Sequence, residues 1–300
     1  MSRWLDLLRR PAAPPAAPFI VGVARSGTTL LRLMLDAHPE LSIPPESYFL
    51  LPFLRRPEVE LRAVTADEFC RAVSGFHTWP DLGISSELLA DEIAKLPAFS
   101  VSEGARRVYA LYTGSRGKAR WGDKTPAYGH HMARIEQLLP EARFVHIVRD
   151  GRDVALSLRQ QWFTPAGDMA GLARHWAETV RELRSEGSRR RHYLEIRYEE
   201  LLRDTRVTLG KLCRFLDLPF DDAMLEYHRT AESRLGEVGD QRLPDGRVVT
   251  RESRLEKHRL AGSPPDESRI GVWREQLTAD EKEAFSAVAG ELLRELGYEA

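Results

Sequence analysis

Phe19-Ile-Val-Gly-Val-Ala-Arg-Ser-Gly-Thr-Thr-Leu-Leu-Arg-Leu-Met-Leu-Asp-Ala-His-Pro39 begins with an apolar run, residues 19–23, that has the composition of a buried strand. A turn rich in Gly, Ser and Thr follows it. Apolar residues then recur at helical spacing until Pro39, which cannot continue a helix. The pattern predicts a strand, a loop of the size that holds a phosphate, and a helix.

The turn nearly matches the Walker pattern, in which two glycines separated by four residues are followed by Lys and Ser/Thr. Gly22 and Gly27 have this spacing, but Thr28 occupies the lysine position. The backbone N–H groups of the loop and the N-terminus of the helix still predict an anion site. Further donors would come from Arg25, Ser26, Thr28 and Thr29.

Length and composition limit the class of protein. The chain has 300 residues, 42% of them hydrophobic, and a formal net charge of −1. It is long enough for one sizeable core, and its balanced charge indicates no general affinity for nucleic acid or membrane. Since no run of about 18 apolar residues occurs, we expect no membrane span.

Cys70 and Cys213 are the only cysteines, and neither has metal-ligating neighbours in the sequence. We therefore expect neither a disulfide framework nor a zinc site, and interpret both thiols as core residues. Without a recognisable signal peptide, this cysteine usage favours a cytoplasmic protein.

The chain divides after residue 17 in this interpretation. Residues 1–17 are an N-terminal extension, a short amphipathic segment followed by a Pro/Ala linker. Residues 18–300 are one domain. Within it, residues 50–118 are expected to be a helical cover, and the polar, element-poor residues 230–268 a lid or acceptor-binding loop.

Strand-like runs alternate with helical ones along the domain. Further strands are expected at 41–43, 144–148 and 193–197. Helices are expected at 132–139, at 205–216 and after Thr278, which begins a capping-box pattern with Glu281. The alternation predicts an α/β fold, a P-loop-like parallel sheet with helices on both faces. The run Trp121–Pro126, which carries Lys124, is expected to be a turn.

Arg149 directly follows the strand expected at 144–148, and Ser157 lies eight residues further on. An arginine at the end of a buried strand needs an anionic partner to balance its charge. This junction is therefore a second candidate anion site. The alternative is an arginine that is solvated or paired with Asp150 or Asp153.

Four stretches, in this order, resemble motifs of the sulfotransferases that depend on 3′-phosphoadenosine 5′-phosphosulfate (PAPS). Gly-Val-Ala-Arg-Ser-Gly-Thr-Thr-Leu-Leu, residues 22–31, resembles the loop for the 5′-phosphosulfate, and residues 148–157 resemble the motif for the 3′-phosphate. Tyr198-Glu-Glu-Leu and Ser268-Arg-Ile-Gly-Val-Trp are similar to two further segments of that family. The resemblance implies the sulfotransferase fold.

The resemblance also implies a role for each matching residue. The 5′-phosphosulfate would be held by Arg25, Ser26, Gly27, Thr28 and Thr29. The 3′-phosphate would be held by Arg149 and Ser157, with Arg269 as a further ligand from a segment that varies across the family. Tyr198 would lie beside the adenine, and no metal would be required.

The general base is where the sequence departs from part of the family. Many cytosolic members have Lys-Thr-His, whereas this chain has Lys124-Thr-Pro126. The 25–40 run followed by Glu46 looks most like the branch that includes the protein-tyrosine and several carbohydrate sulfotransferases, in which a glutamate is the base. We therefore assign Glu46 as the base; the alternative is a helix cap near Ser47.

Other histidines offer competing interpretations. His130 and His131 follow Lys124 closely and are the competing candidates for the base. His38, before Pro39, and His146, inside a strand run, are interpreted as structural.

The implied reaction is an in-line transfer of a sulfuryl group to an acceptor hydroxyl, with Arg25 and Lys124 stabilising the charge of the leaving group. Adenosine 3′,5′-bisphosphate (PAP) would be released. The alternatives are a P-loop phosphotransferase, disfavoured by Thr28, and a non-catalytic nucleotide-binding module. Small-molecule, carbohydrate and peptide hydroxyls all fit as acceptors. The sequence also leaves open whether the chain forms a homodimer.

Overall fold

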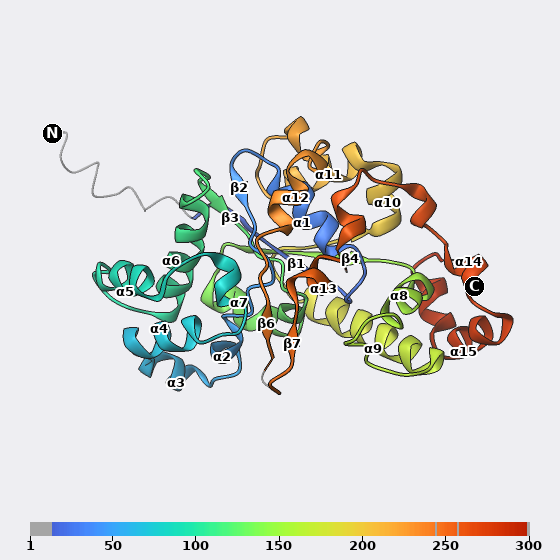
Figure 1. The fold of residues 1–300 in the computed structure, drawn as a ribbon, viewed down its shortest axis with the longest axis horizontal. Helices are drawn as coiled ribbons and strands as arrows, with labels where there is room; N and C mark the ends of the chain where they lie inside the picture. The colour runs from blue at the N-terminus through green and yellow to red at the C-terminus, as the bar shows by residue number, and fades with distance from the viewer. Residues whose placement is uncertain (1–13, 244, 257, 299–300) are drawn as a thin grey trace.

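The computed structural model describes residues 14–243, 245–256 and 258–298, and its centre is a parallel sheet (Figure 1). Three strands pair in the order β1-β4-β5: β1 (Ala17–Val21), β4 (Ala142–Val148) and β5 (Tyr193–Arg197). A second parallel pair is formed by β2 (Leu41–Ser42) and β3 (Arg120–Trp121). A bridge between Phe19 and Asp123 joins β3 to β1, giving the spatial order β2-β3-β1-β4-β5.

Side chains of the central strands alternate between two cores, as a pleated sheet requires. Phe19 and Phe144 are paired in register and pack into the first core, with the helices that lie between β2 and β4 in the sequence. Ile20 and Val145, the next pair, face the second core. Both faces of the sheet are therefore covered, which confirms the predicted α/β class.

Two further groups of helices pack against the sheet. On the face of Ile20 lie α1 (Thr28–Asp36), α10 (Tyr198–Arg203), α11 (Thr205–Phe215) and α12 (His228–Leu235). A third core packs Val23 and Val148 against α8 (Gly151–Leu158), α9 (Met169–Gly187), α14 (Trp273–Gln276) and α15 (Ala279–Glu295). Thr278 and Glu281 form the capping box of α15 that the sequence predicts.

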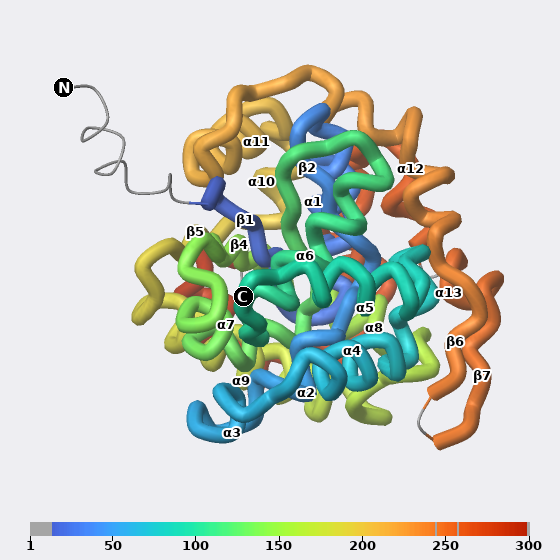
Figure 2. Tube along the Cα trace, turned by 90° about the vertical axis from the view of Figure 1, so that its left-hand side faces the viewer, coloured from blue at the N-terminus to red at the C-terminus, as the bar shows by residue number. Residues whose placement is uncertain are grey.

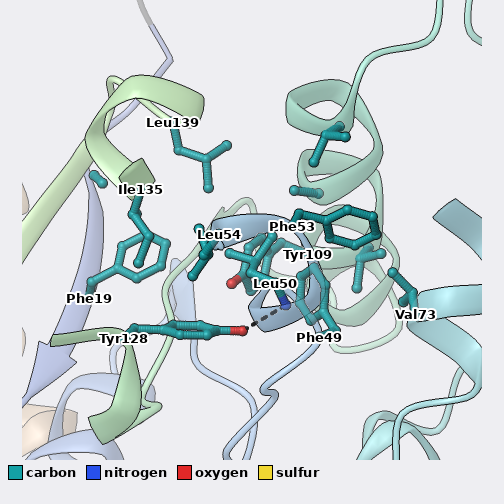
Figure 3. Packing of buried hydrophobic residues seen from close by; sticks show 14 of the residues in the cluster. Phe19, Phe49, Leu50, Phe53, Leu54, Val73, Tyr109, Tyr128, Ile135 and Leu139 are labelled. Atoms are coloured by element: carbon teal, nitrogen blue, oxygen red, sulfur yellow. Dashed lines mark hydrogen bonds between the residues drawn. The ribbon is translucent and has the colours of Figure 1, made fainter. Parts of the chain in front are cut away.

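The helices between β2 and β3 gather at the opposite end of the molecule from α8, α14 and α15 (Figure 1). They are α2 (Leu51–Leu54), α3 (Glu58–Ala63), α4 (Ala66–Ser74), α5 (Ser86–Ala94) and α6 (Val101–Gly114), and α7 (Met132–Leu138) lies beside them. Aromatic side chains fill the space between these helices and the sheet, and the Tyr128 hydroxyl accepts a hydrogen bond from the Leu50 N–H at 3.0 Å (Figure 3). This core fixes the turn that carries Glu46.

Residues 230–268 differ from the expected element-poor loop. The described part contains most of α12, the antiparallel hairpin β6 (Gln241–Arg242) and β7 (Val248–Val249), and α13 (Arg251–Glu256). Figures 1 and 2 show the hairpin projecting along one side of the molecule. The expectation was wrong because each element is too short to leave a periodic apolar pattern.

Two smaller differences concern strand boundaries. β1 begins at Ala17, two residues before the apolar run. β3, Arg120–Trp121, overlaps the first residue of the run that was expected to be a turn. The predicted amphipathic segment at the N-terminus lies outside the described residues. Within the described ranges, no helix combines the length and apolarity needed to cross a bilayer.

Candidate active site

A cavity of about 600 Å³ opens at the carboxyl ends of the parallel strands. Each strand delivers at least one predicted residue to this edge: β1 precedes the Arg25 loop, β2 precedes Glu46, β3 precedes Lys124, β4 precedes Arg149, and β5 precedes Tyr198. The predicted residues that line the cavity are Arg25, Gly27, Thr28, Thr29, Glu46, Arg149, Ser157, Tyr198 and Arg269. The fold therefore brings together segments that are far apart in the sequence.

The loop after β1 has a backbone suited to an anion. Arg25 and Gly27 both have left-handed conformations, with φ of 73° and 97°. Alternating backbone of this kind turns successive N–H groups toward one point. Gly27 is the N-cap of α1, which has neither a side-chain cap nor an acidic residue in its first turn. The helix N-terminus thus keeps its positive potential for a bound anion.

Gly27 is also required by close packing. A Cβ at this position would lie 2.4 Å from Cδ2 of Tyr198. The Tyr198 ring is buried against this loop. The guanidinium of Arg149 lies over that ring, 4.5 Å from its centroid. Tyr198 therefore supports both the first loop and the arginine of the second junction.

The second junction is hydrogen-bonded to the first. Arg25 Nε donates to Ser157 Oγ at 3.0 Å, and Arg149 Nη1 donates to the carbonyl oxygen of Arg25 at 3.3 Å. Burial, followed by the charge of Arg149, lowers the pKa of Arg25. The two guanidinium groups are only partly buried but repel each other, and an anion between them would offset that cost.

Two buried polar atoms near this junction lack a hydrogen-bond partner among the described residues: Ser26 Oγ and Arg149 Nε. Buried donors are usually satisfied, so Arg149 Nε, on a side chain that lines the cavity, is a donor available to an anion. Ser26 itself is almost fully buried and is not part of the cavity wall.

Asp153 ties the C-terminal segment to the second junction. Its Oδ2 accepts from the Gly271 N–H and its Oδ1 from the Trp273 N–H, both at 2.9 Å. Its ion pair with Arg149 is longer, at 3.6 Å, so the alternative pairing considered for Arg149 exists but is loose. Arg149 Nη2 also donates to the Arg269 carbonyl at 3.0 Å. Residues 268–273 are thereby held against the cavity.

Glu46 is clamped between two donors. Lys124 Nζ lies 2.7 Å from its Oε1, and the Tyr48 hydroxyl donates to its Oε2 at 2.8 Å. The side chain of Lys124 is 3% exposed and that of Glu46 is 25% exposed, so the carboxylate faces the cavity while the ammonium lies behind it. α2 begins only at Leu51 and has no side-chain cap, so the alternative in which Glu46 caps a helix is wrong.

A buried network fixes the two turns that carry Glu46 and Lys124. The Ser47 hydroxyl donates to Asp123 Oδ2 at 2.6 Å, and the Ser47 N–H donates to Thr125 Oγ1 at 3.0 Å. The Tyr109 hydroxyl donates to the same Asp123 oxygen at 3.0 Å. Burial raises the pKa of Asp123 to about 6, although these hydrogen bonds oppose the shift.

The competing histidines lie elsewhere. His130 pairs with Glu182 on the exposed side of α9 at 2.8 Å, and neither His130 nor His131 lines the cavity. His38 contacts the Pro219 carbonyl at 2.9 Å, and His146 is fully buried beside the Tyr193 hydroxyl, in keeping with structural roles.

Sequence analysis missed part of the cavity wall. The missed residues include Tyr48, His77, Trp162 and Phe163. Isolated aromatic residues in turns leave no motif, so no sequence signal pointed to them. Burial lowers the pKa of His77.

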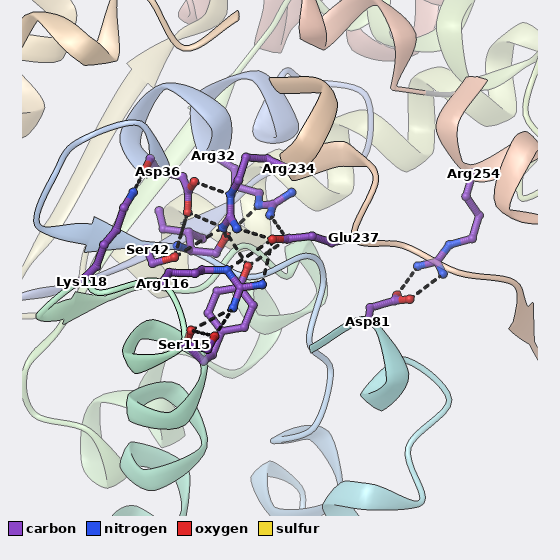
Figure 4. A network of polar contacts seen from close by, with 12 residues as sticks. Arg32, Asp36, Ser42, Asp81, Ser115, Arg116, Lys118, Arg234, Glu237 and Arg254 are labelled. Atoms are coloured by element: carbon purple, nitrogen blue, oxygen red, sulfur yellow. Dashed lines mark hydrogen bonds and ion pairs between the residues drawn. The ribbon is translucent and has the colours of Figure 1, made fainter. Parts of the chain in front are cut away.

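The hairpin closes part of this wall. The Arg247 guanidinium, at its tip, lies 5.7 Å from the ring centroid of the half-exposed Trp162. The base of the hairpin is held by a buried ion pair, in which Arg254 donates to Asp81 with both Nη atoms (Figure 4). Beside it, Arg234 and Glu237 join α12 to α1 and α6 through the polar network drawn in Figure 4.

Comparison with known proteins gives a family match. A model of the sulfotransferase family matches residues 18–222. The nodulation protein NoeE of Sinorhizobium fredii is 25% identical, and the match covers 95% of this chain and 66% of NoeE. Protein-tyrosine sulfotransferase 1 of Danio rerio is also 25% identical, over 94% of this chain and 72% of that protein. The chain thus spans about two thirds of these relatives.

Solved structures agree on the fold. The sulfotransferase domain of the Synechococcus PCC 7002 olefin synthase matches with a TM-score of 0.58 and 24% identity, over 97% of this chain and 98% of that domain. The sulfotransferase domain from the curacin biosynthetic pathway gives a TM-score of 0.62 and 22% identity, over 96% and 99% of the two chains. Sequence identities this low show that the fold is shared and nothing further.

Proposed function

The chain belongs to the sulfotransferase family, and on that premise we propose that it moves a sulfuryl group from PAPS to an acceptor hydroxyl, with Glu46 as the general base. The observation that carries the proposal is the shared cavity. It joins a lysine-less phosphate loop, a second arginine site and a carboxylate held by a lysine.

The residues present fit a donor with anionic groups at both ends of a nucleoside. The first end would be bound by the Arg25 loop and the N-terminus of α1, where left-handed backbone and an uncapped helix favour an anion. The second end would be bound by Arg149 and Ser157, where a buried guanidinium atom lacks a partner. Tyr198 offers a ring face between the two, and Arg269 lies on the cavity wall.

The donor would supply a sulfuryl group attached to a phosphate leaving group. This chain's contribution is positioning and charge stabilisation, which dominate in-line transfers of this kind. Arg25 is part of the loop itself, and Lys124 Nζ lies 3.5 Å from Thr29 Oγ1. In a buried site their charge acts more strongly on developing negative charge than it would in water.

Glu46 would accept the proton of the acceptor hydroxyl as the oxygen attacks sulfur. The new O–S bond forms, the bond from sulfur to the phosphate oxygen breaks, and PAP leaves with that electron pair. A carboxylate that already accepts two hydrogen bonds retains acceptor capacity for a third. General-base assistance of this kind contributes about 10² to 10⁴ in rate.

Residues 230–268 would act as the lid over the acceptor within the single domain of residues 18–300. Support comes from the cavity lining, to which Gln241, Leu243 and Leu260 contribute, and from the contact between Arg247 and Trp162. The acceptor would be a hydroxyl-bearing small molecule, carbohydrate or peptide. Relatives that bear the name protein-tyrosine sulfotransferase make a tyrosyl hydroxyl one candidate.

Calorimetry with two nucleotides tests the donor assignment. We expect PAP to bind in the absence of Mg²⁺ and Mg-ATP to bind at least about tenfold more weakly, because Thr28 replaces the Walker lysine. The carboxylate next to Arg149, that of Asp150, already accepts hydrogen bonds from Arg152 at 2.9 and 3.0 Å. This pairing also disfavours Asp150 as a ligand for Mg²⁺. Mg-dependent ATP turnover without PAP binding would instead establish a phosphotransferase.

A further inference from the structure

We propose that Tyr48 is a positioning residue that holds the Glu46 carboxylate in one orientation and keeps it ionised. The inference rests on the proposed role of Glu46 as the base. Its starting point is geometric: the Tyr48 hydroxyl lies 2.8 Å from Glu46 Oε2, while Lys124 lies 2.7 Å from Oε1. One donor on each oxygen fixes both the rotation and the tilt of a carboxylate.

The backbone of Tyr48 is unusual. Its φ is 52°, and among the described non-glycine residues only Arg25, Tyr48 and Asp217 have positive φ. Such a conformation costs a bulky residue on the order of 1 kcal/mol or more and persists only where the surroundings impose it. Two of these three residues lie in the cavity wall.

The ring of Tyr48 is also in contact with neighbouring rings. It stacks on Phe76 with an interplanar angle of 13° and a centroid separation of 6.2 Å, and His77 lies 6.1 Å away. Burial, and then the charge of Glu46, raises the pKa of Tyr48 well above its ordinary value. The phenol therefore stays protonated at neutral pH and can donate to Glu46.

Several cations lie around Glu46, and the buried carboxyl of Asp123, with a pKa raised to about 6, lies behind it against Ser47. Lys124 approaches from the turn after β3, and Arg25 approaches from the loop after β1. Arg32, Arg254 and His258 line a recess of about 30 Å³ that Glu46 shares with Lys124. Removing the neutral Tyr48 hydroxyl leaves these charged groups in place. The effect of the hydroxyl on the pKa of Glu46 can therefore be measured separately from theirs.

Tyr48→Phe is the direct test, because it deletes the hydroxyl and keeps the stacked ring. The readout is the pH titration of the Glu46 carboxyl carbon by ¹³C NMR, assigned by its disappearance in Glu46→Gln. A donor to the charged form favours ionisation, so its loss moves the titration midpoint to higher pH by about half a unit to one unit. In the pH profile of turnover with PAPS, the rise on the acidic side should move to higher pH by the same amount.

Tyr193→Phe is the matched control. It removes another phenol hydroxyl, one that lies 2.6 Å from His146 Nδ1 and 3.4 Å from Glu195 Oε2, away from the cavity. This variant leaves the Glu46 midpoint unchanged. An unchanged midpoint in Tyr48→Phe overturns the proposal. A shifted midpoint in a protein that binds no PAP supports the positioning role and refutes the sulfotransferase assignment, so the two failures are distinguishable.

Discussion

Arg25 Nε donates a hydrogen bond to Ser157 Oγ at 3.0 Å, across 132 residues of sequence. The bond joins the loop after β1 to the helix after β4, the two segments assigned to opposite ends of the donor. A ligand that spans both segments would contact both partners of this bond. The two proposed anion sites therefore adjoin each other, and we expect a change in either to alter the affinity for the whole nucleotide.

Glu46→Gln should lower turnover at least about a hundredfold while PAP affinity changes less than about threefold, because the amide cannot take up the acceptor proton. Turnover is measured with the acceptor that gives the most product, and affinity by calorimetry. Glu60→Gln, on the exposed surface of α3, is the control and should behave as the unmodified chain. Near-normal turnover of Glu46→Gln would rule out this carboxylate as the base.

Arg149→Ala should weaken PAP binding about ten- to a hundredfold, since a hydrogen bond to a charged group contributes about 1.5–3 kcal/mol. Ser157→Ala removes a neutral donor and should weaken binding less. Both affinities are measured by calorimetry against Arg62→Ala, which removes an exposed arginine paired with Glu58 in the same helix. If Arg149→Ala binds PAP as the unmodified chain does, the second anion site is wrongly assigned.

Gly27→Ala should destabilise the fold by about 2 kcal/mol or more and abolish PAP binding. The φ of 97° disfavours a side chain, and the added Cβ would press on the Tyr198 ring. Gly210→Ala, in the middle of α11, meets only the end of Arg214 at 3.8 Å and should stabilise by about 0.5–1 kcal/mol. Denaturant unfolding measures both. Equal effects of the two changes would contradict this account of the loop.

Asp123→Asn should flatten part of the pH dependence of stability. Burial raises the pKa of Asp123 to about 6 from an ordinary 3.8, so the folded state favours the protonated carboxyl. The stabilisation is complete below about pH 4 and is lost as the pH rises through about 6. The difference amounts to at most roughly 3 kcal/mol.

The measurement is the free energy of unfolding between pH 4 and 7.5 for both proteins. The other acidic groups titrate alike in the two, so the difference isolates Asp123. The unmodified chain should lose stability relative to Asp123→Asn across this window. Parallel curves would show that the carboxyl titrates at its ordinary pH.

The sequence predicted the parts of the fold that repeat or that follow a motif. Strand β5 and the capping box at Thr278 were found where expected, because a short run of strand-forming residues and a helix cap both have local sequence signatures. The two-residue strand β3 was missed, since a pair of residues has no period. The hairpin β6–β7 was missed for the same reason.

The candidate site divides in a similar way. Motif residues such as Arg25, Arg149 and Glu46 were predicted and do lie around one cavity. Tyr48 was not, because its importance lies in a hydroxyl that meets Glu46 and in a strained backbone, neither of which sequence spacing encodes. The support that Asp153 gives to residues 268–273 likewise depends on contacts between distant segments.

The most direct test of the central claim is transfer itself. The purified chain is incubated with PAPS and a panel of phenols, sugars, alcohols and tyrosyl peptides, and mass spectrometry follows both PAP and sulfated acceptor. The account predicts that one acceptor class gains a sulfuryl group in step with PAP release, without added Mg²⁺, and that Glu46→Gln abolishes this gain. PAP binding without any sulfated product across the panel, or Mg-dependent ATP turnover in place of PAPS binding, would contradict it.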